Sequence, residues 1–160
     1  MAAERLRESG ISDDVSFLLA RANALSIEFA NAALSGAGLK VRSYTVLALA
    51  TESAPPTQRE LSEFLRLDPS QIVALVDELQ RRRLVERRPH PEDRRANVVV
   101  ATPAGRSVAA EARRSTEEAE AIVHAALSPG EREQLATLLR RIAYADREYE
   151  EAYADRKRER

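Results

Sequence analysis

The sequence contains no cysteine, and that absence removes several classes of site. Without thiols the chain has no disulfide framework, no thiol redox switch and no thiolate ligand for a metal. No apolar run approaches about 18 residues, so we expect no membrane-spanning helix. The first residues lack the apolar segment of a secretory signal peptide. These features favour a cytoplasmic protein, and 160 residues are enough for a single domain with its own core.

The usual sequence features of enzyme sites are also missing. There is no glycine-rich phosphate loop, and the two histidines, His90 and His124, are too far apart in sequence for a metal-ligand pair. The carboxylates of Glu117, Glu118 and Glu120 fall where an exposed helix face is expected. We therefore expect no catalytic residue, no metal and no cofactor, and we expect that the protein is not an enzyme.

The stretch from Thr57 to Thr102 has the most informative pattern. Residues 58–65 place Leu61, Phe64 and Leu65 at helical spacing on one face. A second helix is predicted to begin at Asp68 as N-cap with Pro69 at the first helical position. Two helices separated by so few residues are typical of a helix-turn-helix. The second helix has apolar residues at positions i, i+3, i+4 and i+7, which are Ile72, Leu75, Val76 and Leu79.

Two segments rich in β-branched residues follow these helices. Residues 84–88 and 96–101 are predicted to pair as a hairpin, and residues 89–95 join them. Prolines on both sides of His90 keep this loop from pairing further, and two arginines lie at its tip. The expected fold is therefore mainly α with a small β-hairpin wing, a winged helix-turn-helix.

The formal charge of −1 hides an uneven distribution along the chain. Residues 81–95 carry seven arginines and three carboxylates, a net of +4, whereas residues 107–160 carry ten basic and twelve acidic side chains. Because the Debye length is only about 8 Å at physiological salt, local charge decides where a polyanion docks. Solvation of a helix end, where the helix dipole favours basic side chains, explains Arg81 and Arg82 as well as binding to a polyanion does.

Three motifs in this region resemble the MarR-type family of bacterial transcriptional regulators. They are Leu84-Val85, then Pro91-Glu92-Asp93-Arg94-Arg95, then Thr102-Pro103-Ala104-Gly105-Arg106. The resemblance implies a sequence-specific regulator, in our interpretation a repressor, that binds double-stranded DNA as a homodimer on a pseudo-palindromic operator. The family usually has a small polar residue, a polar or basic residue and glycine where this chain has Gln71, Ala74 and Arg83.

The helices at the two ends of the chain are expected to form the dimer. Ser12 is the candidate N-cap of the first long helix, whose apolar stripe runs from Val15 to about Leu34. The last helix begins at a capping box of Ser128 and Glu131, and its stripe continues to Tyr149 and Tyr153. These stripes suit either an intramolecular bundle or a homodimer, and the resemblance favours the homodimer. We thus expect one domain over 1–160, with dimerisation regions at 12–36 and 103–153 and a winged helix-turn-helix at 41–102.

The DNA contacts are assigned by position in the motif. The outer face of the second helix is expected to enter the major groove, where Gln71 suits adenine and small side chains suit thymine methyls. The wing is expected to reach the minor groove, with Asp93 holding the tip and aiming one guanidinium, as in the family. The recognition-helix residues are Ser70, Gln71, Val73 and Ala74. The wing residues are Asp93, Arg94 and Arg95, and the phosphate contacts are Thr57, Gln58, Arg59 and Arg88.

Two further expectations depend on the resemblance. Many MarR-type repressors are released by small aromatic or anionic molecules that bind between the dimer helices and the winged domain. Phe29, Arg42 and Tyr44 are the candidate residues for such an effector, although core packing explains Phe29 and Tyr44 equally well. The competing function is a winged-helix module that binds a protein partner, and such a module would show no salt-dependent binding to duplex DNA.

Overall fold

The computed structural model describes residues 2–93 and 95–145, and the chain divides into two compact units, Met1–Val123 and His124–Arg160. The described residues are mainly helical with one two-stranded hairpin, which confirms the predicted fold class. Arg94, Tyr149 and Tyr153 lie outside the described residues. In the first unit the elements are α1 (Ala2–Arg7), the 3-10 turn η1 (Gly10–Asp13), α2 (Val15–Leu34), the 3-10 turn η2 (Ser35–Ala37), α3 (Val41–Leu49), α4 (Gln58–Leu65), α5 (Pro69–Arg81), β1 (Val85–Pro89), β2 (Asn97–Ala101) and α6 (Pro103–Val123). The second unit contains α7 (Pro129–Ala143).

The helix-turn-helix forms where the sequence predicts it, because local capping signals fix both helix starts. Glu60 N donates to Thr57 Oγ1 over 3.2 Å, and Thr57 N donates to Glu60 Oε2 over 2.7 Å. At the start of α5, Ser70 N donates to Asp68 Oδ1 over 2.8 Å, and Pro69 occupies the first turn. The predicted stripe of α5 is confirmed, since Ile72, Val76 and Leu79 are buried and Leu75 is half-buried.

Phe64 was expected on the buried face of α4, and that prediction is wrong. Leu61 is buried and Leu65 is half-buried, but Phe64 is 59% exposed. The inner face of this eight-residue helix is short, and Leu61 and Leu65 fill it. The Phe64 side chain instead lines a surface hollow together with Pro55, Pro56 and His90.

The hairpin packs against the chain segment that precedes α4. β1 pairs antiparallel with β2 in a register that sets Val85 opposite Ala101 and Arg87 opposite Val99. Val99 N donates to the carbonyl oxygen of Pro56 over 2.8 Å, and Ala101 N donates to that of Ala50 over 2.8 Å. A single antiparallel bridge between Thr57 and Val98 extends this contact.

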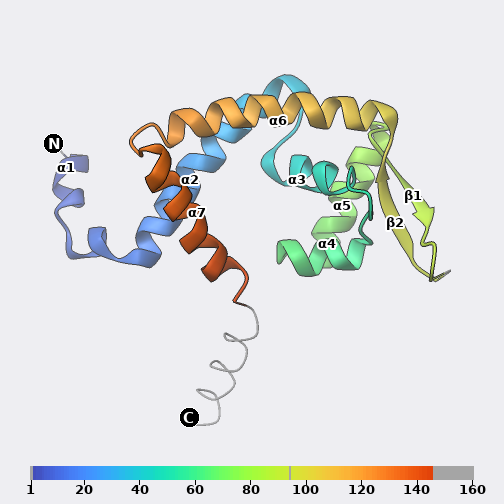
Figure 1. The fold of residues 1–160 in the computed structure, drawn as a ribbon, viewed down its shortest axis with the longest axis horizontal. Helices are drawn as coiled ribbons and strands as arrows, with labels where there is room; N and C mark the ends of the chain where they lie inside the picture. The colour runs from blue at the N-terminus through green and yellow to red at the C-terminus, as the bar shows by residue number, and fades with distance from the viewer. Residues whose placement is uncertain (1, 94, 146–160) are drawn as a thin grey trace, which may run out of the picture. The chain divides into compact units, whose positions relative to one another are not determined.

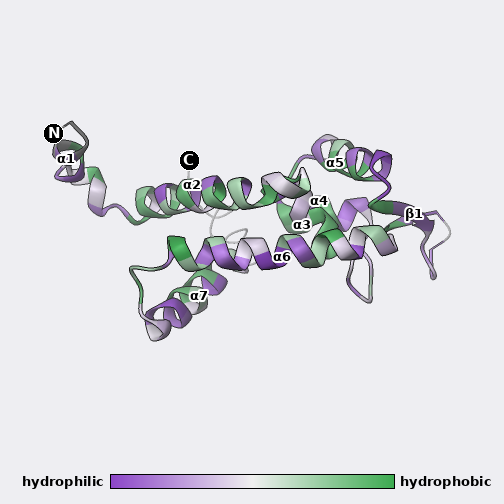
Figure 2. Cartoon of the chain, turned by 90° about the horizontal axis from the view of Figure 1, so that it is seen from above, coloured by the Kyte–Doolittle hydropathy of each residue, from purple (hydrophilic) through white to green (hydrophobic). Residues whose placement is uncertain are grey.

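Two long helices, α2 and α6, lie side by side in the first unit (Figures 1 and 2). α6 buries Ala109, Ala112 and Ala119, and these small side chains let the two backbones approach closely. The start of α2 differs from the prediction: Asp14, not Ser12, is the N-cap, and its Oδ1 accepts from Phe17 N over 3.0 Å. Ser12 lies in η1, where its hydroxyl donates to the carbonyl oxygen of Leu6.

The apolar stripe of α2 is uncovered along much of its length. Val15 is 67% exposed, and Leu18, Leu25 and Phe29 are also exposed. Figure 2 shows hydrophobic residues recurring along this helix. Considered by itself, α7 likewise carries exposed apolar residues, which are Leu135, Leu138, Leu139 and Ile142.

The hairpin and α6 meet at a junction where the two backbones almost touch. A Cβ atom added to Gly105, in the first turn of α6, would lie 1.9 Å from the carbonyl oxygen of Leu84. Thr102 Oγ1 donates to the carbonyl oxygen of Arg83 over 2.8 Å and accepts from Gly105 N over 3.0 Å. The junction therefore fixes the direction in which α6 leaves the winged region.

Replacing Gly105 by alanine is expected to lower the free energy of unfolding by about 1–3 kcal/mol, because the added methyl group must displace backbone that has no room to move. Urea denaturation measures the change. Gly130→Ala is the matched control, since nothing lies within 4 Å of a Cβ at that helical position. Equal stability of the two variants would mean that the junction is not tightly packed.

Candidate functional site

The amino-terminal half of α5 presents an outer face with no covering element in the first unit. Ser70, Gln71, Val73 and Ala74 are all exposed, and Val73 is 43% exposed despite its apolar side chain. The opposite face of the helix is buried, so these four side chains are not part of the core. Hydrogen bonds from the Ser70 hydroxyl and backbone N–H lower the pKa of Asp68 and keep this N-cap ionised.

The predicted phosphate-binding residues of α4 gather at its amino end. Thr57 is held by the capping box, and hydrogen bonds from its backbone N–H and hydroxyl lower the pKa of Glu60. Arg59 is 87% exposed at its side chain, and its Nε donates to Glu63 Oε1 over 2.8 Å. Gln58 is half-buried, and its amide oxygen accepts a hydrogen bond from Arg87 Nε.

Arg87 holds α4, α5 and the hairpin together, a role that the sequence did not reveal. Its Nε donates to Gln58 Oε1 over 2.7 Å, its Nη2 donates to Asp77 Oδ1 over 2.5 Å, and its Nη1 donates to Gln80 Oε1. One planar guanidinium thus bonds acceptors on two helices from a position on β1. We call Arg87 with Gln58, Asp77 and Gln80 the Arg87 clamp. The sequence indicates only that Arg87 occupies an inward-facing position of the first strand. It does not indicate the three partners, because they lie on other elements of the chain.

The wing tip is ordered by side chains that bond the backbone. His90 Nδ1 accepts from the backbone N–H groups of Glu92 and Asp93, each over 3.1 Å. Asp93 Oδ1 accepts from Arg95 N over 2.9 Å, and the Asp93 carbonyl oxygen accepts from Ala96 N over 3.0 Å. Asp93 therefore bonds the backbone of Arg95, which leaves the exposed Arg95 side chain pointing outward.

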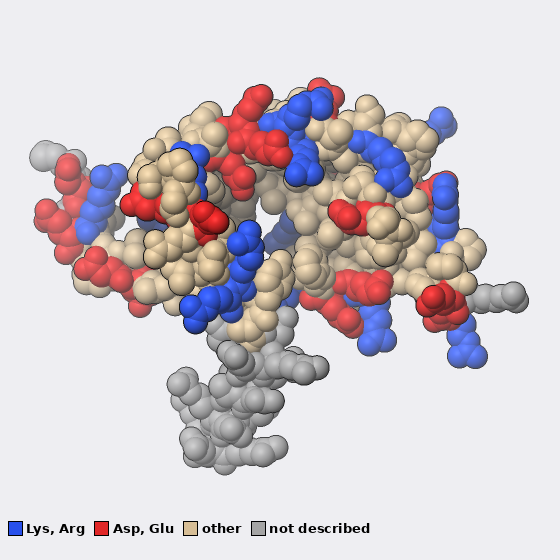
Figure 3. All heavy atoms as spheres, viewed as in Figure 1, with Lys and Arg blue, Asp and Glu red and all other residues tan. Residues whose placement is uncertain are grey.

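Two arginines that are predicted to contact phosphate, Arg59 and Arg88, lie beside carboxylates. Arg88, predicted to contact phosphate, donates from Nε to Glu86 Oε1 over 2.7 Å, and 60% of its side chain is exposed. Figure 3 shows blue and red side chains next to each other over α4 and over the wing. Exposed pairs of this kind contribute only about 0–1 kcal/mol each, so an incoming anion can replace the carboxylate at little cost.

Two arginines of the basic run have structural roles. Arg82 donates from Nη1 to the carbonyl oxygen of Gly38 and from Nη2 to that of Ala37, each over 2.7 Å. Arg83 follows the end of α5 in a left-handed conformation with φ of 58°, where the related family usually has glycine. Leu84 N then donates to the carbonyl oxygen of Leu79 over 2.9 Å, which closes the helix end.

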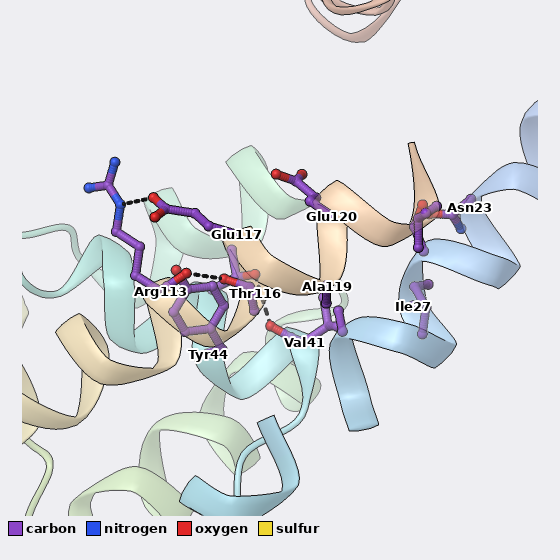
Figure 4. Close-up of a pocket in the computed structure, with 13 residues that line it drawn as sticks. Asn23, Ile27, Val41, Tyr44, Arg113, Thr116, Glu117, Ala119 and Glu120 are labelled. Carbon is purple, nitrogen blue, oxygen red and sulfur yellow. Dashed lines mark hydrogen bonds and ion pairs between the residues drawn. The ribbon is translucent and has the colours of Figure 1, made fainter. Parts of the chain in front are cut away.

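A cavity of about 420 Å³ lies between α2, α3 and α6 (Figure 4). Tyr44 lines it, whereas Phe29 and Arg42, the other two candidate effector residues, do not. Apolar side chains including Ile27 and Val41 form part of its wall. Arg113 stands at one side, where Glu117 accepts from its Nε over 2.9 Å and raises the pKa of the guanidinium.

Within residues 2–93 and 95–145 there is no cluster of histidine and carboxylate side chains arranged to hold a metal ion. None of the helices in that part of the chain has the length and apolar content needed to cross a membrane.

Comparison with known proteins places this geometry among transcriptional regulators. A sequence model of the MarR family matches residues 37–96. A MarR-family regulator from Rhodococcus sp. RHA1 is 37% identical over 86% of this chain and 99% of its own length, with a TM-score of 0.79. CouR from Rhodococcus jostii RHA1, solved with p-coumaroyl-CoA bound, is 39% identical over 86% of this chain and 96% of CouR, with a TM-score of 0.79. A probable transcriptional regulator from Pseudomonas aeruginosa is 29% identical over 82% of this chain and 98% of its own, with a TM-score of 0.74. A comparison with curated proteins by sequence gives no match.

Replacing Arg87 by lysine is expected to lower the free energy of unfolding by about 1–2 kcal/mol, because an ammonium group cannot bond Gln58, Asp77 and Gln80 at once. Chemical denaturation provides the measurement. Arg88→Lys is the control on the same strand, and its exposed pair with Glu86 predicts a change within about 0.5 kcal/mol. If both variants matched the wild type, the clamp would have no role in stability.

Proposed function

We propose, since this chain belongs to the MarR family of transcriptional regulators, that it is a sequence-specific double-stranded DNA-binding repressor acting as a homodimer on a pseudo-palindromic operator. The observation that carries the proposal is the outer face of α5, which is exposed from its first turn and bordered by the wing. An α-helix fits the major groove of B-DNA, and the first turns of a recognition helix contact base edges.

The residues of α5 suggest an operator rich in A·T pairs. The amide of Gln71 can bond adenine at N6 and N7, as glutamine does in the major groove. Val73 and Ala74 present exposed methyl groups next to it, and thymine methyls are their natural partners. Ser70, at the start of the helix, lies where it can bond a base or a phosphate.

Wing and phosphate contacts position the protein on the duplex. We assign Arg94 and Arg95 to the minor groove, whose narrow A·T-rich segments concentrate negative potential. Asp93 supports that contact by bonding the Arg95 backbone. The phosphate contacts are Thr57, Gln58, Arg59 and Arg88, and the last two exchange a carboxylate partner for a phosphate.

Two copies of the chain are needed for this geometry. The exposed stripe of α2 and that of α7 are the apolar surfaces that a partner subunit would cover. We therefore assign 12–36 and 103–153 to dimerisation and 41–102 to DNA binding within one domain. The packing of α2 against α6 within the first unit leaves Val15 and Leu18 exposed.

A small-molecule effector is the proposed release signal. The cavity beside Tyr44 is of the size of ligand pockets and lies against α6, the helix that starts at the wing junction. CouR was solved with p-coumaroyl-CoA, so an aromatic acyl thioester is the first effector to test. A ligand that binds better to the state released from DNA lowers operator affinity by that difference.

The dimer is expected in dilute solution without DNA. Sedimentation at micromolar concentration should give about twice the chain mass of 17.8 kDa. Leu18→Glu should shift the protein toward monomer, because a charge cannot be buried unpaired in an apolar interface. Glu28→Gln is the control on the same helix. A wild-type monomer would contradict the proposal.

The proposed base and phosphate contacts predict different DNA-binding defects for two variants. Gln71→Ala should weaken operator binding by about 1–3 kcal/mol and relax the preference at one base pair per half-site. Arg59→Ala should weaken binding to all sequences about equally, as a phosphate contact does. Selection from a random duplex pool should return an inverted repeat with half-sites about one helical turn apart. Recovery of G·C-rich half-sites by the wild type would contradict the assignment of base contacts to Gln71, Val73 and Ala74.

The double variant Arg94→Ala with Arg95→Ala should bind the operator weakly and with a smaller salt dependence. Its stability should change by no more than about 0.5 kcal/mol, because Arg95 is exposed and the sequence sets Arg94 next to it. Titration of operator at several salt concentrations, with thermal unfolding as the stability check, measures both. Unchanged operator affinity would show that the wing takes no part in binding.

A further inference from the structure

His90 lies at the base of the wing tip and against the helix-turn-helix. The residue is half-buried and lines the surface hollow that Pro55, Pro56 and Phe64 also form. Its backbone N–H donates to the carbonyl oxygen of Ala96 over 3.0 Å, across the loop that joins β1 to β2. His90 is therefore anchored on both sides, by the hairpin and by the hollow beside α4.

The His90 ring bonds the backbone of the tip through one nitrogen. Nδ1 accepts from the N–H groups of Glu92 and Asp93, each over 3.1 Å. N–H groups a few residues further along the chain are the donors that asparagine and aspartate side chains bond in turns. The imidazole nitrogen thus takes the place of a side-chain oxygen as the acceptor that folds this turn.

Those two bonds lead to the arginine of the tip. Asp93, whose N–H is fixed by His90, accepts from Arg95 N through Oδ1 over 2.9 Å and from Ala96 N through its carbonyl oxygen over 3.0 Å. Arg95 is exposed, and it is one of the two residues assigned to the minor groove. His90 therefore acts through Asp93 on the place of the Arg95 backbone.

Both bonds require a neutral imidazole. An N–H group on Nδ1 would face two other N–H donors, so the proton of the neutral ring must be on Nε2. Histidine is the side chain whose charge ordinarily changes between about pH 5 and 8. Protonation puts a hydrogen on Nδ1 and removes both acceptor interactions at once, so the ordered turn is present at higher pH and lost as the pH falls.

The charged groups near the ring come from α4 and from the loop itself. Glu60 of α4 lines the same hollow, and its pKa is lowered first by the hydrogen bonds of its capping box and then by the charge of His90. The other residues that line the hollow carry no titratable group. In the loop, Glu92 and Asp93 carry carboxylates, and the arginines at 94 and 95 follow them in sequence. An imidazolium released from the turn therefore has carboxylate partners nearby.

We propose that His90 is a positioning residue of the wing: its neutral Nδ1 orders the tip for DNA, and acidification releases the tip and weakens operator binding. The inference rests on the proposed DNA binding and adds to it a residue and a direction of pH dependence. Added charge alone would act in the opposite sense, because a further cation near the duplex strengthens binding. The sign of the pH effect therefore distinguishes ordering of the tip from simple attraction.

The experiment measures operator binding by the full-length protein at about pH 8 and about pH 5.5, a range in which ordinary carboxyl groups stay mostly ionised. The operator is the duplex recovered by selection, and the salt concentration is held constant. The wild type should bind about tenfold more weakly at the lower pH, as expected for the loss of two hydrogen bonds in each wing.

Three variants separate the role of the ring from other effects of pH. His90→Ala should bind about tenfold more weakly than the wild type at the higher pH and show no further loss at the lower pH. His90→Asn should recover most of that affinity at both pH values, because its amide oxygen can accept the same N–H groups and does not titrate. His124→Asn is the control, since His124 is the other histidine and belongs to the second unit, and it should keep the wild-type pH effect. Thermal unfolding identifies any variant that fails to fold.

A measurement without DNA tests the turn itself. In heteronuclear NMR spectra the neutral His90 ring should carry its proton on Nε2. The amide signals of Glu92 and Asp93 should shift together as the ring titrates, because both N–H groups lose the same acceptor. In His90→Asn the two signals should not shift over the same pH range.

The outcomes are distinguishable. A proton on Nδ1 of the neutral ring, tighter operator binding at the lower pH, or a wild-type pH effect in His90→Asn would overturn the inference. Absence of duplex binding at both pH values would contradict the DNA-binding proposal and with it the role of His90 in binding. The NMR titration would then still decide whether the ring orders the tip.

Discussion

The close approach of Gly105 to Leu84 is the constraint on which the rest of the first unit depends. The end of α5, the start of β1 and the first turn of α6 meet there, and Thr102 bonds the carbonyl oxygen of Arg83 at the same place. A side chain at position 105 would separate α6 from the hairpin. With glycine there, α6 leaves the junction in one direction and carries its buried alanines along α2.

This junction joins the two surfaces to which we assign function. The Arg87 clamp fixes the outer face of α5 relative to the wing, and the junction fixes both relative to α6. The opposite part of α6 lines the cavity beside Tyr44. A ligand that shifted α6 there would act on a helix that contacts the segment after α5 at this junction. The proposed coupling of effector and DNA would then need only two positions of one helix.

Much of the fold was predictable because its signals are local. The cap at Asp68 with Pro69 and the boxes of Thr57 with Glu60 and Ser128 with Glu131 lie within a few residues of the helix starts they fix. The misplaced start of α2 arose because Ser12 and Asp14 are both good caps, and the 3-10 turn of Gly10–Asp13 takes the first.

The rest depends on contacts between distant residues. Arg87 is 29 residues from Gln58, and Arg106 is 55 residues from Thr51, whose carbonyl oxygen it bonds, so neither contact has a pattern in the sequence. The exposure of Phe64 likewise follows from how α4 packs, which helical spacing does not reveal. The faces of α5 were predictable because the apolar stripe fixed its inner side, and the outer side followed by exclusion.

The salt dependence of duplex binding tests the central claim most directly. Four arginines per subunit, at positions 59, 88, 94 and 95, are assigned to the DNA backbone or minor groove. A dimer that engages most of them should show a plot of log affinity against log salt with a slope steeper than about −5, since each neutralised phosphate contributes about −0.9. A slope near zero, or no duplex binding, would contradict the account and favour a winged-helix module that binds protein.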